Sequence, residues 1–128
     1  MNSILVIDDS EPVREYLTFI LEKEGYKVAT AEHGEEGLEL FKKHRYDVVI
    51  TDIAMPQKDG IETLIEIKEI DSASKVIVIS GAERQSTLLK IAGIFSADAM
   101  ITKPFTSEAV LYAVNEVLGV YAHGRNVN

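Results

Sequence analysis

Short apolar runs alternate along this chain with longer segments in which apolar residues recur every three or four positions. The runs are rich in Val and Ile, which favours buried strands. They cover residues 3–7, 27–31, 48–51, 75–80 and 99–102. Apolar residues at helical spacing predict a helix after each strand. These helices cover about 12–24, 34–44, 61–70, 85–95 and 107–118.

The alternation of strands and helices indicates an α/β protein with a parallel sheet covered by helices on both faces. Right-handed crossovers leave few topologies, and 128 residues are too few for a barrel, which needs about 250. We therefore predict a flavodoxin-like, doubly wound (βα)5 fold with five parallel strands in the order 2-1-3-4-5. It forms one domain over residues 1–119, and the aperiodic tail over 120–128 is expected to fray.

The composition limits the class of protein further. Hydrophobic residues make up 46% of the chain and charged residues 27%, which is typical of a globular domain. The absence of cysteine excludes disulfides and thiolate metal sites, and the net charge of -8 argues against direct binding to nucleic acid. No apolar run reaches membrane-spanning length and no signal peptide is visible, so we expect no membrane contact and a cytoplasmic location.

Polar residues stand where the strands of the predicted sheet end. Asp8 and Asp9 follow the first strand, and Asp52 follows the third. Ser80 ends the fourth strand, and Lys103 comes directly after the fifth. The carboxyl ends of parallel strands share one edge of the sheet, where open α/β sheets bind their ligands. We therefore expect these five side chains to converge.

Three neighbouring carboxylates repel one another, and a cation would relieve that repulsion. Hard oxygen ligands suit Mg²⁺, which binds one or two carboxylates together with water and phosphoryl oxygens. Softer metals lack ligands, because the chain has no cysteine and its histidines lie away from these strand ends. The histidines, His33, His44 and His123, are expected at the surface without partners. The sequence therefore predicts a magnesium site.

An aspartate beside Mg²⁺ can accept a phosphoryl group covalently. Asp52 is the expected nucleophile, because it ends the central strand. Asp9 is expected to hold the metal, with Asp8 contributing directly or through water. The amine of Lys103 and the hydroxyl of Ser80 would stabilise the transferred group.

These residues give the chain a resemblance to the receiver domains of two-component response regulators, in particular to stand-alone regulators of the chemotaxis type. The resemblance covers about residues 3–118. Each motif is weak alone, but together, at these spacings on a (βα)5 pattern, they are highly specific. The motifs are Asp8-Asp9, Asp52 followed by Met55-Pro56 and Asp59-Gly60, Ser80, and Lys103-Pro104-Phe105.

The resemblance implies a phosphoacceptor at Asp52 that assists its own phosphorylation and dephosphorylation and is otherwise no enzyme. A histidine kinase or a histidine phosphotransfer protein would be the donor. The implied Mg²⁺ ligands are Asp8, Asp9, Asp52 and the backbone carbonyl of Ala54. The peptide bond between Lys103 and Pro104 is expected to be cis by the same resemblance.

The resemblance also implies a switch with a separate output protein. Phosphate on Asp52 would draw Ser80 inward and change the face formed by the fourth helix, the fifth strand and the fifth helix. Signalling through a homodimer is the other route. Family members usually carry Tyr or Phe three residues before the lysine, where this chain has Met100. A flexible thioether would give a less discrete switch than an aromatic ring.

Two other classes of function stay open. A phosphorylation-independent binding module could keep the same fold, and Met100 is the feature that favours it. An aspartyl-phosphate hydrolase fits less well, because enzymes that resemble the haloacid dehalogenases place the nucleophile on the first strand in an Asp-x-Asp pattern. The first loop, Asp8-Asp9-Ser10, lacks that pattern, and its acidity argues against binding a flavin phosphate.

Overall fold

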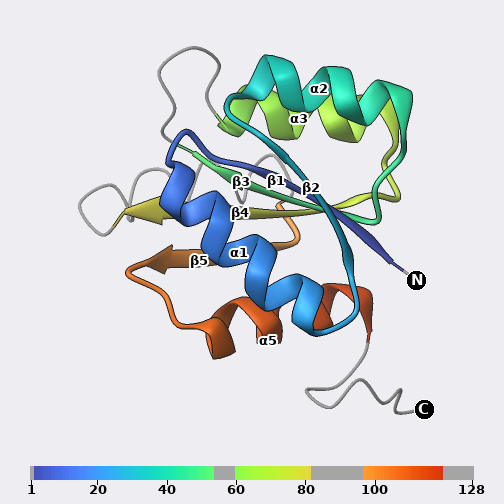
Figure 1. Ribbon diagram of the computed structural model, residues 1–128. Coiled ribbons are helices and arrows are strands. Elements are labelled where there is room, and N and C mark those ends of the chain that lie inside the picture. The colour runs from blue at the N-terminus through green and yellow to red at the C-terminus, as the bar shows by residue number, and fades with distance from the viewer. Residues whose placement is uncertain (1, 54–59, 82–96, 120–128) are drawn as a thin grey trace.

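The computed structural model describes residues 2–53, 60–81 and 97–119 (Figure 1). The strands are β1 (Ser3–Ile7), β2 (Lys27–Ala31), β3 (Val48–Asp52), β4 (Lys75–Gly81) and β5 (Ala99–Lys103). The helices are α1 (Glu11–Lys23), α2 (Gly34–Lys43), α3 (Gly60–Ile70) and α5 (Ser107–Leu118). The predicted helix over 85–95 and the predicted tail over 120–128 lie outside the described residues.

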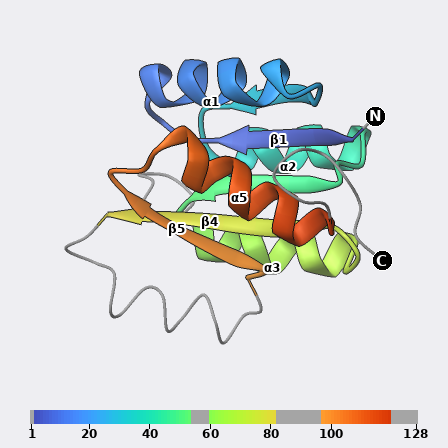
Figure 2. The ribbon, with the colours of Figure 1, turned by 90° about the horizontal axis from the view of Figure 1, so that it is seen from below.

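The five strands form one parallel sheet in the order β2-β1-β3-β4-β5, which confirms the predicted topology. Helices α1 and α5 cover one face of the sheet, and α2 and α3 cover the other (Figure 1). Figure 2 shows the same layers from below, where α5 crosses in front of the sheet. None of the described helices has the length and apolar character needed to span a membrane.

The central strands send alternate side chains into the two helix-covered faces. Leu5 and Ile7 of β1 pack in the cluster that includes α2 and α3, whereas Ile4 and Val6 pack in the cluster that includes α1 and α5. All four side chains are fully buried. A register shift of one residue would exchange these faces, so apolar burial fixes the register of the strands. The polar residues at the strand ends are therefore held in a fixed relation.

Helix α1 begins directly after the acidic loop, and local signals fix its start and end. Ser10 is the N-cap, and its Oγ accepts a hydrogen bond from the Val13 N–H at 3.5 Å. Pro12 lies in the first turn, where the missing N–H costs nothing. Gly25 follows the helix with a φ of +95°, a conformation that favours glycine. The N-cap Ser10 and Pro12 therefore fix the end of the loop that contains Asp8.

Candidate functional site

Three carboxylates meet at the carboxyl end of the sheet. Asp8 follows β1, and Asp52 is the last residue of β3, which pairs with β1 in parallel register. With Asp9, they offer ligand oxygens that all lie within 4.8 Å of one another. Asp8 and Asp52 are buried, whereas Asp9 is exposed. The structure therefore brings together the three acids that the sequence predicts as metal ligands.

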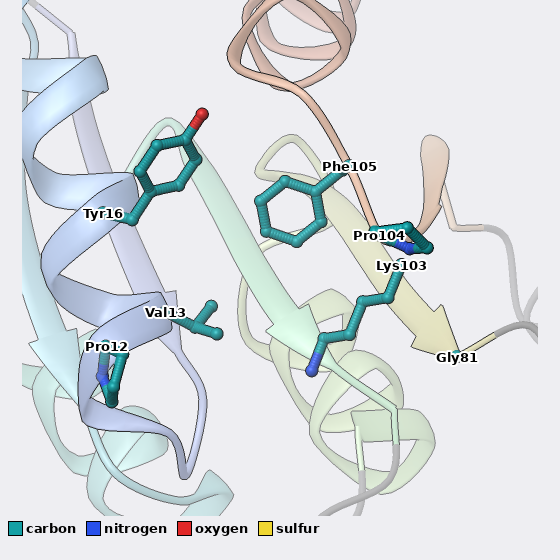
Figure 3. Close-up of a pocket in the computed structure, with 7 residues that line it drawn as sticks. All are labelled: Pro12, Val13, Tyr16, Gly81, Lys103, Pro104 and Phe105. Carbon is teal, nitrogen blue, oxygen red and sulfur yellow. The ribbon is translucent and has the colours of Figure 1, made fainter.

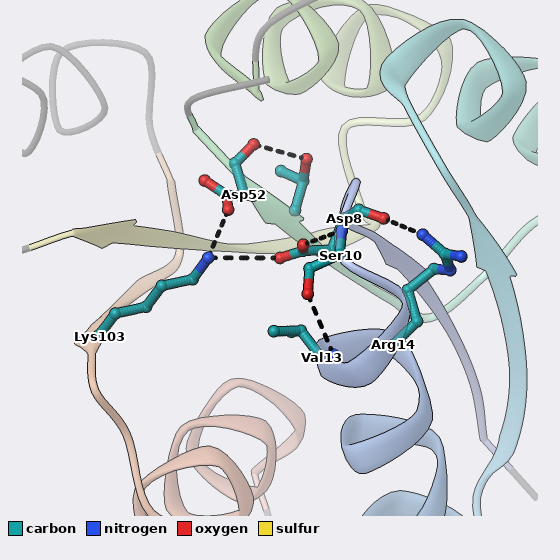
Figure 4. Close-up of polar contacts among 7 residues, drawn as sticks. Asp8, Ser10, Val13, Arg14, Asp52 and Lys103 are labelled. Atoms are coloured by element: carbon teal, nitrogen blue, oxygen red, sulfur yellow. Dashed lines mark hydrogen bonds and ion pairs between the residues drawn. The ribbon is translucent and has the colours of Figure 1, made fainter. Parts of the chain in front are cut away.

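Lys103 reaches these acids from the end of β5 (Figure 4). Its Nζ lies 2.7 Å from Asp52 Oδ2 and 3.8 Å from Asp8 Oδ2. Burial by itself would lower the pKa of Lys103, but the hydrogen bond with Asp52 and the charges of Asp52 and Asp8 raise it above the ordinary value. The lysine therefore stays charged and neutralises part of the acidic cluster.

Asp8 carries the strongest electrostatic perturbation at this end of the sheet. Burial is the largest influence and raises the pKa of Asp8 from 3.8 to about 6, with Asp52 and Asp9 adding to the rise. The Ser10 N–H, which donates to Asp8 Oδ1 at 2.8 Å, and the amine of Lys103 oppose it. A buried carboxyl held this far from its ordinary pKa beside other acids is typical of a functional site.

Two buried polar atoms at this end have no hydrogen-bond partner among the residues that the structure describes. They are Asp8 Oδ2 and Ser80 Oγ. Asp8 Oδ2 belongs to the acidic cluster, and an oxygen that receives no hydrogen bond is a ligand that a hard cation would satisfy. Ser80 pairs with Thr102 in the register of β4 and β5, one position before the pair of Gly81 with Lys103. Both atoms fit a site that binds a metal and an anion.

Two residues that sequence reasoning missed hold the acids in place. Arg14 donates from Nη1 to the backbone carbonyl of Asp8 at 2.7 Å, which fixes the loop between β1 and α1 (Figure 4). Gly60, named from sequence only as part of the Asp59-Gly60 motif, packs its Cα against the backbone of Asp52, where any Cβ would collide with the carbonyl oxygen. The hydrophobic periodicity of the sequence predicts neither of these two contacts.

Other predicted residues have different placements. Met100 is 44% exposed, so its thioether does not fill a buried cavity in this conformation. The peptide bond between Lys103 and Pro104 is cis. Ala54, whose carbonyl was predicted as a metal ligand, lies outside the described residues, as do Met55, Pro56 and Asp59.

The expectation that His33 has no partner is wrong. His33 is half-buried and is the N-cap of α2, where its Nδ1 accepts a hydrogen bond from the Glu36 N–H at 3.3 Å. Glu36 in turn accepts a hydrogen bond from the Glu32 N–H at 2.7 Å. These bonds satisfy one N–H in the first turn of α2 and one before its N-cap, so helix capping accounts for the half-burial of His33.

A parallel α/β sheet that gathers three acids, a lysine and a serine at its carboxyl end belongs to the class of α/β domains with a site suited to a hard cation and a phosphoryl group. Residues 4–115 match the family described as response regulator receiver domain. The chain belongs to this family, whose members are generally signalling switches in two-component systems rather than classical enzymes.

Three known relatives of nearly the same length illustrate the similarity. The chain is 40% identical over 116 residues to the chemotaxis protein CheY of Bacillus subtilis, covering 90% of this chain and 96% of that protein. The response regulator TrrA of Thermotoga maritima, solved in complex with Mg²⁺-BeF, is 36% identical with a TM-score of 0.81, covering 91% and 99% of the two chains. CheY in the CheX-CheY-BeF3-Mg²⁺ complex of Borrelia burgdorferi is 38% identical with a TM-score of 0.85, covering 91% and 89%.

Proposed function

We propose that this protein is a phosphorylation-operated switch that accepts a phosphoryl group on Asp52 from a histidine kinase or a histidine phosphotransfer protein. The observation that carries the proposal is the convergence of Asp8, Asp9 and Asp52 within 4.8 Å, with the Lys103 amine 2.7 Å from Asp52. Two solved relatives in complexes that contain Mg²⁺ and a beryllium fluoride support it.

Each group has a role in the transfer. A carboxylate oxygen of Asp52 forms the bond to phosphorus, and the bond from phosphorus to the donor breaks. Bound Mg²⁺ would neutralise charge on the phosphoryl oxygens, with Asp8, Asp9, Asp52 and the Ala54 carbonyl as its proposed ligands. Lys103 would exchange its contact with Asp52 for one with the phosphoryl group.

The buried hydroxyl of Ser80 connects phosphate to output. Its Oγ has no hydrogen-bond partner among the described residues, so a phosphoryl oxygen would supply one. We propose that this contact shifts the face formed by helix four, β5 and α5, where Met100 is 44% and Tyr112 65% exposed. A separate output protein or a second copy of the chain would read that face. We also propose that the protein assists its own dephosphorylation and acts in the cytoplasm, without contacting nucleic acid.

Beryllofluoride with Mg²⁺ provides the direct test, because it mimics the phosphoryl group. Amide NMR signals of residues at the carboxyl end of the sheet should shift in the wild type. Intact mass spectrometry after incubation with phosphoramidate should show one added phosphoryl group. The matched Asp52→Asn variant should show neither change. An unchanged wild-type spectrum, or an adduct that persists in Asp52→Asn, would contradict the proposal.

The same experiment distinguishes a second candidate, a binding module that does not use phosphate. The exposure of Met100 favours it, since no buried ring is present at this position to move with Ser80. Such a module would bind its partner equally with and without beryllofluoride. A pull-down under both conditions therefore separates the two functions and identifies the partner.

A further inference from the structure

An apolar groove adjoins the proposed phosphoacceptor. It has a volume of about 720 Å³ and lies between the start of α1 and the residues around the end of β5 (Figure 3). Among the residues that the structure describes, Lys103 is the one charged residue that lines it. The described lining residues are Pro12, Val13, Tyr16, Gly81, Lys103, Pro104 and Phe105. A groove of this composition suits an apolar group that carries an anion at one end.

Two aromatic rings, Tyr16 from α1 and Phe105 from the segment after β5, approach each other across the groove and form a wall at one end of it (Figure 3). The ring centroids of Tyr16 and Phe105 are 6.2 Å apart, with an angle of 35° between the ring planes. Phe105 is half-buried and packs against the core, whereas Tyr16 remains 42% exposed. A third ring could pack against this pair at the offset geometry that aromatic groups prefer. The wall therefore favours an aromatic ligand over a small aliphatic one.

The amine of Lys103 points away from the two aromatic rings (Figure 3). It lies 2.7 Å from Asp52 Oδ2. Any phosphoryl donor must bring phosphorus next to this carboxylate. The group attached to phosphorus must then occupy adjoining space, and the groove is apolar space that adjoins it. Charge complementarity with Lys103 places the phosphoryl end of such a donor at the amine.

We propose that the groove binds the organic group of a small-molecule acyl phosphate and favours an aromatic acyl group; this rests on the proposed phosphorylation of Asp52. A carboxylate oxygen of Asp52 forms a bond to phosphorus while the bond from phosphorus to the acyl oxygen breaks. The leaving carboxylate keeps the electron pair of that bond. The reaction transfers no proton and needs no oxidant.

The test compares two donors, benzoyl phosphate and acetyl phosphate, in the presence of Mg²⁺. Intact mass spectrometry gives the second-order rate constant for Asp52 phosphorylation with each donor. The ratio of the two constants cancels general effects of a variant on Asp52. We expect this ratio to fall about tenfold in Tyr16→Ala and in Phe105→Ala. Because Tyr16 is 42% exposed, its variant should fold even if Phe105→Ala does not.

Phe19→Ala is the matched control. Phe19 lies on the same helix and is 65% exposed, but it is not among the residues that line the groove. Its variant should keep the wild-type ratio. An equal ratio in the wild type and the three variants would overturn the assignment of the groove. The exposed rings would then be assigned to a surface that contacts another protein.

Phosphoramidate, which has no organic group, separates this proposal from the proposed function. If phosphoramidate modifies Asp52 but the ratio of the two rate constants is unchanged in Tyr16→Ala and Phe105→Ala, only the groove assignment is wrong. If none of the three donors modifies Asp52, both proposals are wrong.

Discussion

The amino and carboxyl ends of the sheet differ in how completely their polar groups are paired. At the amino end, Ser74 Oγ donates to the Tyr46 carbonyl at 2.8 Å. Lys68 Nζ donates to the Ser74 carbonyl at 2.8 Å and to Asp98 Oδ2 at 2.7 Å. Asp98 Oδ2 also accepts from the Val76 N–H at 2.8 Å. Each of these charged or buried groups has a partner, which is what a stabilising role requires.

The polar groups at the carboxyl end of the sheet are less completely paired. Three carboxylates cluster there, and the amine of Lys103 forms ion pairs with two of them, Asp52 and Asp8. Asp8 Oδ2 and Ser80 Oγ have no hydrogen-bond partner among the described residues. Such an arrangement costs stability in the free protein and gains free energy when a cation and an anion bind. The paired end therefore fits a role in the fold, and the less completely paired end fits the proposed role in ligand binding.

Replacing one lysine at each end should produce the largest contrast. Lys103→Met should slow phosphorylation of Asp52 by phosphoramidate about 100-fold, because it removes the cation beside the transferred group. Lys68→Met should keep that rate but lower the free energy of unfolding by about 1–3 kcal/mol, because Asp98 loses its charged partner. Mass spectrometry and urea unfolding measure the two quantities. Similar rate losses in both variants would contradict the assignment of different roles to the two ends of the sheet.

The fold could be predicted from the sequence because buried residues recur at regular spacings in strands and helices. Apolar runs and helical spacing predict the order of elements, and the rule that parallel strands end at one edge brings Asp8, Asp52, Ser80 and Lys103 together. These residues lie at the ends of four separate strands, and the strand register brings those ends to the same edge of the sheet. The main features of the candidate site therefore follow from topology.

The supporting contacts could not be predicted in the same way. The Arg14 hydrogen bond to the Asp8 carbonyl depends on a side-chain rotamer, and the close approach of Gly60 to Asp52 depends on how α3 packs. The exposure of Met100 likewise depends on the packing around β5. Periodicity and strand-end rules carry no information about such contacts, because they describe which face a residue occupies and not which atom it touches.

Removing one acid from the unsatisfied end should weaken metal binding. Asp8→Asn should lower the affinity for Mg²⁺ at least about tenfold, because it removes a negative ligand from the cluster. Isothermal titration calorimetry of the free protein measures the affinity. Asp98→Asn, the matched change at the amino end, should leave it unchanged. Equal affinity in Asp8→Asn and the wild type would contradict the assignment of Asp8 to the metal site.

The same variant should stabilise the metal-free protein. The pKa of Asp8 is about 6 in the folded state against 3.8 ordinarily, so the folded protein binds more protons between these values. Stability from this group is therefore present below about pH 4 and is lost as the pH rises through 6. At pH 7, with chelator, Asp8→Asn should be more stable by about 3 kcal/mol, and the difference should vanish near pH 4. Urea unfolding at both pH values measures this difference in stability. A difference that does not change with pH would show that the raised pKa of Asp8 is not its cause.

Two buried serines provide the smallest and most closely matched test. Ser74 is 3% and Ser80 1% exposed, but Ser74 Oγ donates a hydrogen bond whereas Ser80 Oγ has no partner among the described residues. Ser74→Ala should lower the free energy of unfolding by about 1 kcal/mol, whereas Ser80→Ala should lower it less or raise it. With beryllofluoride and Mg²⁺, only Ser80→Ala should reduce the NMR shifts on β5 and α5. A larger stability loss in Ser80→Ala would show that its hydroxyl serves the fold, as Ser74 does, and not the phosphoryl group.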